Sequence, residues 1–174
     1  MEGGRQRNQA AMQCDRCKRI VGAFGPGDGR MEEYWPRTVG GKDFPDVPTH
    51  LAEAADEAHR CLSIDAFRAA VAMARAVVEA TAKEQGVDSG NLMEKIDKLA
   101  EAGVISDAMK DAAHEIRFAG NESAHGDLAA GSISEEDALD VVGLMDAILL
   151  RVYQEPAQVE RVRQRRLARK SGTS

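Results

Sequence analysis

The sequence predicts an all-α protein, a bundle of about five helices with a loop-rich N-terminal segment and a basic C-terminal helix. Ala supplies much of the apolar content, Glu and Arg are frequent, and only 4% of the residues are aromatic, which favours helices over sheets. After Pro48, apolar residues recur at spacings of three and four, the period of a helix with one buried face. With 174 residues, the chain has room for one core, so we expect one bundle to carry the fold.

The N-terminal segment, residues 1–47, contains most of the prolines and several closely spaced glycines between residues 22 and 29. No long helix can run through such a stretch. We therefore divide the chain into a loop-rich segment (1–47), a helical bundle (48–156) and a basic helix with its tail (157–174).

The first two predicted helices follow Pro48. Thr49 is a candidate N-cap for a helix that carries Leu51, Ala55, Ala58 and Leu62 on one face. Ser63 or Asp65 begins a second helix, which ends at Gly86. Its apolar stripe predicts a central position in the bundle and consists of Phe67, Val71, Ala74, Val78 and Ala82.

The next two predicted helices form an antiparallel hairpin. Asn91 opens one that carries Leu92, Ile96 and Leu99 and closes at Gly103. Ser106 caps the other, which closes near Gly120.

Ser134 and Asp137 make a capping box for a fifth helix, whose apolar residues surround most of its circumference through Val152. Two interpretations are open: a buried central helix, or a helix with one face left for a partner chain. Pro156 is expected to interrupt it, and a basic helix should follow from about Ala157 to Lys170.

Charge and hydropathy argue against some classes of function. Residues 31–159 hold 25 acids against 11 bases, while residues 161–170 hold six bases and no acid. An acidic body argues against a broad nucleic-acid surface, so any such contact must be local. No stretch is apolar enough for a membrane span or a secretory signal, and three cysteines fit a reducing compartment. We expect a cytoplasmic protein that contacts no membrane.

The spacing of Cys14 and Cys17 is that of a zinc knuckle, which is half of a closed four-ligand site. Two interpretations are open. Zinc binds with distant or symmetry-related ligands, for which Cys61, His50 and His59 are candidates, or the pair belongs to a degenerate ribbon with free thiols.

Residues 115–126 bring three polar side chains to one turn, Arg117, Asn121 and His125. In one interpretation Asn121 caps backbone groups and His125 pins the connection through hydrogen bonds. In the other, Arg117 binds a phosphodiester and His125 moves a proton during attack by a ribose 2′-hydroxyl.

Two further groups are candidates for supporting roles. Arg75 and Glu79 stand one turn apart in the second helix, at a spacing that permits an ion pair, and we expect them to brace the turn at residues 120–125. The tail can contact phosphates or a partner protein, or it is a solvated helix that pairs with an acidic surface. Its candidate contact residues are Arg161, Arg163, Arg165 and Arg166.

Over about residues 31–158 the sequence resembles DUF4145, a family of unknown function within the HEPN-like group of helical bundles. The matching elements are Tyr34-Trp35-Pro36, Glu53-Ala54, residues 74–79, Asn91-Leu92, Gly103-Val104-Ile105, Ile116-Arg117, Gly120-Asn121 and Ala124-His125. Family members often carry an N-terminal zinc ribbon, to which Cys14 and Cys17 would correspond, although the second cysteine pair is absent here.

The resemblance implies a helical bundle, often dimeric, in bacterial and phage nucleic-acid-processing systems, including defence. It suggests a homodimeric, non-catalytic binding module with RNA or a nucleic-acid-processing protein as partner. The alternative is a metal-independent endoribonuclease that uses Arg117 and His125. Seven residues separate that pair here, where the motif of such enzymes has four to six.

Overall fold

The computed structural model describes residues 7–15, 18–26, 28–35, 39–114 and 133–171. The chain divides into two compact units, Met1–Val39 and Gly40–Ser174. The second unit holds all the helices described below, and the all-α prediction is confirmed for it. Within the described residues no helix is long and apolar enough to cross a bilayer.

The N-terminal unit is a small antiparallel sheet, where the sequence indicated only loops. Its strands are β1 (Arg7–Gln13), β2 (Ile20–Pro26) and β3 (Glu33–Trp35), in the order β1-β2-β3. Gly22 pairs with Trp35 across β2 and β3. Gly25 lies where the backbone carbonyl of Arg30 occupies the space of a Cβ atom. Glycine is unfavourable in a strand by propensity, but here it permits the close approach of two backbone segments.

The helical unit begins with α1 (Thr49–Ser63) and α2 (Phe67–Glu84). Two predicted boundaries are wrong. Thr49 is the first helical residue, not a cap, because Pro48 holds the N-cap position and no side chain caps the helix. α2 starts at Phe67 because Ser63 still belongs to α1 and Asp65 has a φ of +61°, outside the helical region.

The later helices start where the sequence indicates. Asn91 forms a capping box with Glu94 at α3 (Leu92–Glu101), and Ser134 forms one with Asp137 at α5 (Glu135–Leu149). Residues 107–114 are helical, and the Ser106 hydroxyl accepts a hydrogen bond from the Met109 N–H at 3.3 Å. The predicted extension of this helix to Gly120 lies outside the described residues.

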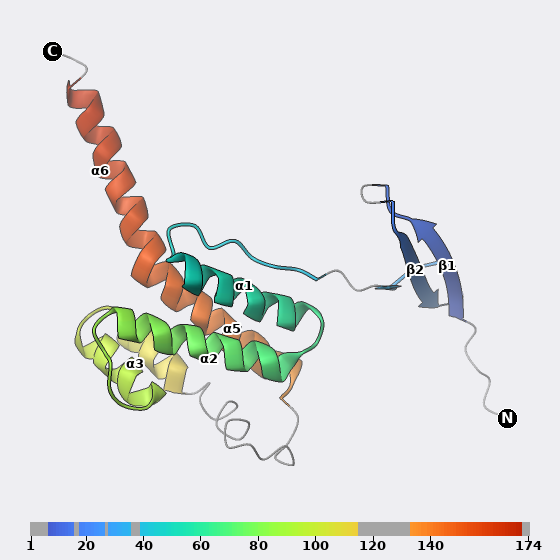
Figure 1. Cartoon of the computed structure of the whole chain (residues 1–174), viewed down its shortest axis with the longest axis horizontal. Coiled ribbons are helices and arrows are strands. Elements are labelled where there is room, and N and C mark those ends of the chain that lie inside the picture. The colour runs from blue at the N-terminus through green and yellow to red at the C-terminus, as the bar shows by residue number, and fades with distance from the viewer. Residues whose placement is uncertain (1–6, 16–17, 27, 36–38, 115–132, 172–174) are drawn as a thin grey trace. The chain divides into compact units, whose positions relative to one another are not determined.

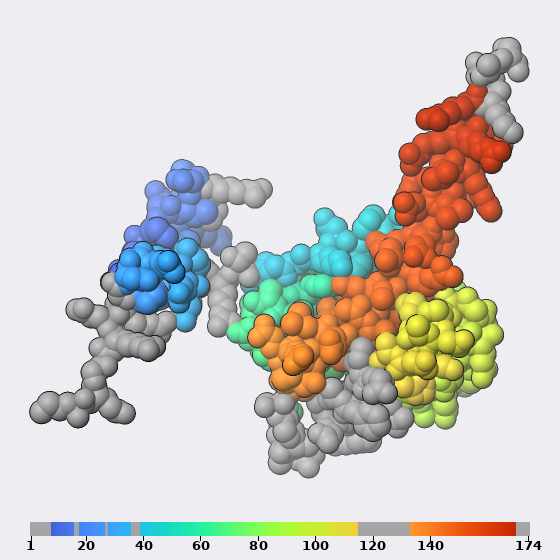
Figure 2. Space-filling view, turned by 180° about the vertical axis from the view of Figure 1, so that it is seen from behind, coloured from blue at the N-terminus to red at the C-terminus, as the bar shows by residue number. Residues whose placement is uncertain are grey.

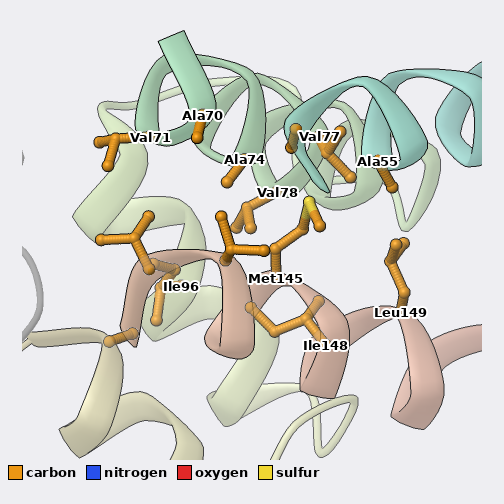
Figure 3. Close-up of a cluster of buried hydrophobic side chains, with 14 of the residues drawn as sticks. Ala55, Ala70, Val71, Ala74, Val77, Val78, Ile96, Met145, Ile148 and Leu149 are labelled. Carbon is orange, nitrogen blue, oxygen red and sulfur yellow. The ribbon is translucent and has the colours of Figure 1, made fainter. Parts of the chain in front are cut away.

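The core forms where α1, α2 and α5 pack against one another (Figure 1). Val78 of α2 lies beside Met145 of α5 (Figure 3), and both are at most 5% exposed. One side of α5 is therefore buried, as expected for a central helix. The opposite side is not: Leu139 is 51% and Leu150 46% exposed.

Pro156 does not interrupt the chain's last helix, so that prediction is wrong. α5 runs through a π-helical turn, η1 (Leu150–Gln154), directly into α6 (Glu155–Ser171). The Glu155 N–H donates to the Leu150 carbonyl five residues back. Proline lacks the N–H that an α-helix would pair with the carbonyl four residues earlier, and its ring clashes there. The wider π turn just before Pro156 accommodates both defects.

Residues 40–48, hereafter the strap, lie along α1 and α5. The backbone N–H groups of Gly40 and Lys42 donate to Ser63 Oγ at 2.9 Å and to Asp56 Oδ1 at 3.0 Å. The Phe44 side chain is 7% exposed and belongs to the bundle core. The strap thus adds apolar burial to the bundle as well as backbone hydrogen bonds.

Candidate functional site

Helix α6 leaves the bundle and is exposed from Gln158 to Arg169 (Figures 1 and 2). Among the described elements it packs only against η1, from which it continues. Arg, Gln and Ala are good helix formers, which accounts for its conformation in the absence of a packed face. This projecting helix carries the bases that the sequence singled out.

The root of α6 is tied to the strap. Arg161 Nη1 donates to Asp46 Oδ1 at 2.6 Å, and Gln154 Nε2 donates to the Pro45 carbonyl at 3.0 Å. Asp46 has a φ of +66°, which a short polar residue tolerates better than most. Arg161 therefore fixes the helix to the bundle and is less available to a ligand than the arginines beyond it.

The arginines beyond Arg161 face solvent. Arg163 is 72% exposed and lies 3.8 Å from Glu160, a loose surface pair. Arg165 and Arg166 are exposed and make no ion pair within the part of the chain that the structure describes. At 100° per residue, Arg163 and Arg166 occupy adjacent positions on one side of the helix.

A groove of about 450 Å³ lies at the base of α6, between its first turns and the turn that follows α3. This groove could not be predicted from the sequence, because its two walls come from segments about 50 positions apart and each wall has the pattern of an ordinary helix or turn. Its lining includes Val104, Arg151, Val152, Pro156, Val159 and Arg163.

The predicted Arg117, Asn121 and His125 cluster lies outside the described residues, so its convergence stays a prediction. Arg75 and Glu79 lie half-buried one turn apart on α2, and Arg75 has an interaction partner. Their predicted contact with the 120–125 turn falls on the same segment and is likewise a prediction.

Cys14 lies at the tip of the β1–β2 hairpin, and Cys17 lies outside the described residues. The tip is tight, with the Lys18 N–H donating to the Cys14 carbonyl at 2.8 Å and the Cys14 N–H to the Arg19 carbonyl at 2.9 Å. Two thiolates are half of a closed tetrahedral zinc site. Among the described residues no group of three or more Cys, His, Asp or Glu side chains is placed to hold a metal. Zinc binding at Cys14 and Cys17 therefore stays a prediction.

His59, one of the candidate zinc ligands, is instead paired with a carboxylate. Its Nε2 lies 3.0 Å from Asp146 Oδ1, and Lys42 Nζ donates to Asp146 Oδ2 at 2.6 Å. The Phe44 ring lies beside both side chains: its centroid is 5.8 Å from the centroid of the His59 ring and 5.4 Å from Lys42 Nζ. The cluster ties α1, α5 and the strap together.

His50 belongs to a second cluster that the sequence did not reveal. Its Nε2 lies 2.9 Å from Glu84 Oε1, and the Tyr153 hydroxyl donates to Glu84 Oε2 at 2.7 Å. Burial, and then the hydrogen bond to Glu84, raise the pKa of Tyr153 to about 12. The phenol therefore stays protonated at neutral pH and acts as a hydrogen-bond donor from η1 to α2.

Comparison with known proteins gives one match. The family model of DUF4145, described as a domain of unknown function, matches residues 56–165. No curated protein matches the chain, and no solved structure matches it. The matched region includes the groove at the base of α6 and the first two exposed arginines beyond Arg161, Arg163 and Arg165.

Proposed function

Because the chain belongs to the DUF4145 family, whose function is not known, we propose a function from the geometry of α6. The chain is a non-catalytic, homodimeric binding module of a bacterial or phage nucleic-acid-related pathway, with defence as the expected setting. Helix α6 is its contact element for nucleic acid. The observation that carries this proposal is a basic helix that projects from an acidic bundle.

Charge segregation supports a polyanionic partner. Residues 161–170 hold six bases and no acid, against 25 acids and 11 bases in residues 31–159. Lys and Arg that neutralise phosphates release condensed counterions, which supplies most non-specific binding free energy. The acidic bundle repels phosphates, whereas the bases of α6 attract them.

The stability of α6 points the same way. Its bases stand at i and i+4 in the pairs Arg161 and Arg165, Arg165 and Arg169, and Arg166 and Lys170. Like charges at this spacing destabilise a helix. A bound phosphate backbone would relieve that repulsion.

The exposed side of α5 supports the dimer. Leu139, Gly143 and Leu150 lie within about 40° of one another around the helix, and all three are exposed. A glycine in a helix interior costs about 1 kcal/mol relative to alanine, and no described atom lies within 4 Å of where a Gly143 Cβ would stand. Nothing in the described chain requires this glycine, whereas a second helix packed closely against it would.

The proposal is tested by replacing Arg163, Arg165 and Arg166 with glutamine, which keeps the length and helix propensity of the side chains. Affinity for a fluorescent RNA or DNA oligonucleotide should fall about tenfold or more, because most of the phosphate contacts are lost. A matched control replaces three bundle lysines, Lys83, Lys95 and Lys110, with glutamine and should bind like the wild type.

An assay with RNA distinguishes the binding module from the enzymatic alternative. With EDTA present, wild-type protein should leave a mixed RNA pool intact. RNA cleavage that disappears in His125→Ala would instead support the endoribonuclease and overturn the non-catalytic part of the proposal.

A further inference from the structure

The groove at the base of α6 has an apolar floor. Val104 and Val152 are partly buried and pack against the bundle core, and Pro156 and Val159 continue the floor onto α6. Val159 is 53% exposed although it faces this hollow. At about 450 Å³, the groove falls in the lower part of the range of small-molecule sites. It has room for a single flat ring system with its sugar.

The rim of the groove is polar and carries both donors and acceptors. Arg151 Nη1 donates to Glu155 Oε2 at 2.8 Å across one helical turn, and Arg163 lies 3.8 Å from Glu160. Carboxylate oxygens accept hydrogen bonds from exocyclic amino groups of bases, and guanidinium groups donate to ring nitrogens, carbonyls and phosphates. An apolar floor with such a rim suits a nucleobase better than it suits an aliphatic chain.

Charge complementarity indicates how the ligand continues beyond the groove. Arg163 belongs both to the groove and to the solvent-facing side of α6, and Arg166 follows one turn further on. A phosphate attached to a base in the groove would therefore lie beside Arg163, and the next phosphates would meet Arg166. The groove and the basic helix form one continuous surface of about three helical turns.

We propose that this groove holds one unstacked base of a single-stranded nucleic acid whose phosphates run along α6. The inference rests on the proposed function and names its substrate class. A base in a duplex is stacked and paired, and extracting it costs a few kcal/mol. The chain therefore prefers single strands to duplexes of equal length.

The test compares two substitutions one turn apart on the same helix. Val159→Gln places a polar side chain in the groove, whereas Val162→Gln changes an equally exposed valine, 57% exposed, that does not line it. Glutamine is a better helix former than valine, so both variants should fold. Affinities are measured for one single-stranded oligonucleotide and for its duplex, and the single strand carries 2-aminopurine as a reporter of base stacking.

Wild-type protein should bind the single strand about fivefold or more tightly than the duplex, and 2-aminopurine fluorescence should change on binding. Val159→Gln should remove this preference and leave duplex binding unchanged, and Val162→Gln should retain it. Equal affinity for both forms, or equal effects of the two substitutions, would overturn the groove proposal while leaving α6 as a phosphate-binding helix. Binding of neither form would overturn the proposed function as well.

Discussion

His59 of α1 and Asp146 of α5 meet across the helix interface, with His59 Nε2 3.0 Å from Oδ1 and 3.1 Å from Oδ2 of the carboxylate. Each side chain is 20% exposed, so the pair is largely shielded from water. Asp146→Ala should lower the free energy of unfolding by about 1 to 3 kcal/mol, because it leaves His59 and Lys42 without their acceptor. Chemical denaturation measures this difference.

Asp140 provides the matched control on the same helix. It is exposed and forms no ion pair or side-chain hydrogen bond among the described residues, so Asp140→Ala should change stability by less than about 0.5 kcal/mol. Equal effects of the two substitutions would show that the Asp146 cluster does not hold α1 to α5.

Tyr153 predicts how the stability of the fold depends on alkaline pH. Its pKa is raised to about 12 by burial and by the hydrogen bond to Glu84, against about 10 in an unfolded chain. Between these two values the folded state binds more protons than the unfolded state, so stability falls as pH rises. Below about pH 10 this contribution is fully present, and it is lost as pH passes about 12.

The Tyr153 titration can be followed directly in a Tyr34→Phe variant, because the chain has only two tyrosines. Tyrosinate absorbance should then rise with a midpoint near pH 12 in the folded protein and near 10 in denaturant. Identical midpoints in both states would contradict the buried hydrogen bond.

The strap predicts where the chain can be shortened. Removal of residues 1–39 deletes one compact unit and should leave the bundle with nearly unchanged stability and helicity. Removal of residues 1–47 also deletes Phe44 from the core and should cost about 3 to 5 kcal/mol. Circular dichroism during denaturation measures both. Phe44→Ala in the full chain should reproduce most of the larger loss, and equal stability of the two shortened chains would refute the role of the strap.

The exposed side of α5 predicts how the dimer can be broken. Light scattering of the wild type should give twice the mass of one chain. Gly143→Arg should give a folded monomer, because it places a charge between Leu139 and Leu150 on the proposed contact side. Ala76→Arg, on an exposed position of α2, is the matched control and should stay dimeric. A monomeric wild type at micromolar concentration would disprove the dimer.

Local sequence signals predicted much of the bundle because they act within a few residues. Asn91 and Ser134 start their helices through hydrogen bonds to backbone groups two or three residues away, and such caps are legible in sequence. The apolar stripe of α2 could likewise be predicted, because it depends only on the helical spacing of residues within one segment. The prediction that Pro156 ends the helix was wrong because a five-residue π turn lets the helix continue through the proline. No sequence periodicity predicts that turn.

Contacts between distant segments could not be predicted. The strap depends on pairs such as Gln154 with Pro45 and Arg161 with Asp46, which are more than 100 positions apart and match no motif. The same holds for the groove, whose walls meet only in the folded bundle. By contrast, the arginines of α6 could be predicted as candidate contact residues from charge alone. The helix makes few tertiary contacts, so most of its charged side chains stay exposed.

The salt dependence of nucleic-acid affinity tests the central claim most directly. If Arg163, Arg165, Arg166 and Arg169 each neutralise a phosphate of a single strand, the logarithm of the association constant should fall with the logarithm of salt concentration with a slope of about −3. Replacement of Arg163, Arg165 and Arg166 by glutamine should reduce that slope to about −1. Undetectable binding at low salt, or a slope that this replacement leaves unchanged, would contradict the assignment of α6 as the contact helix.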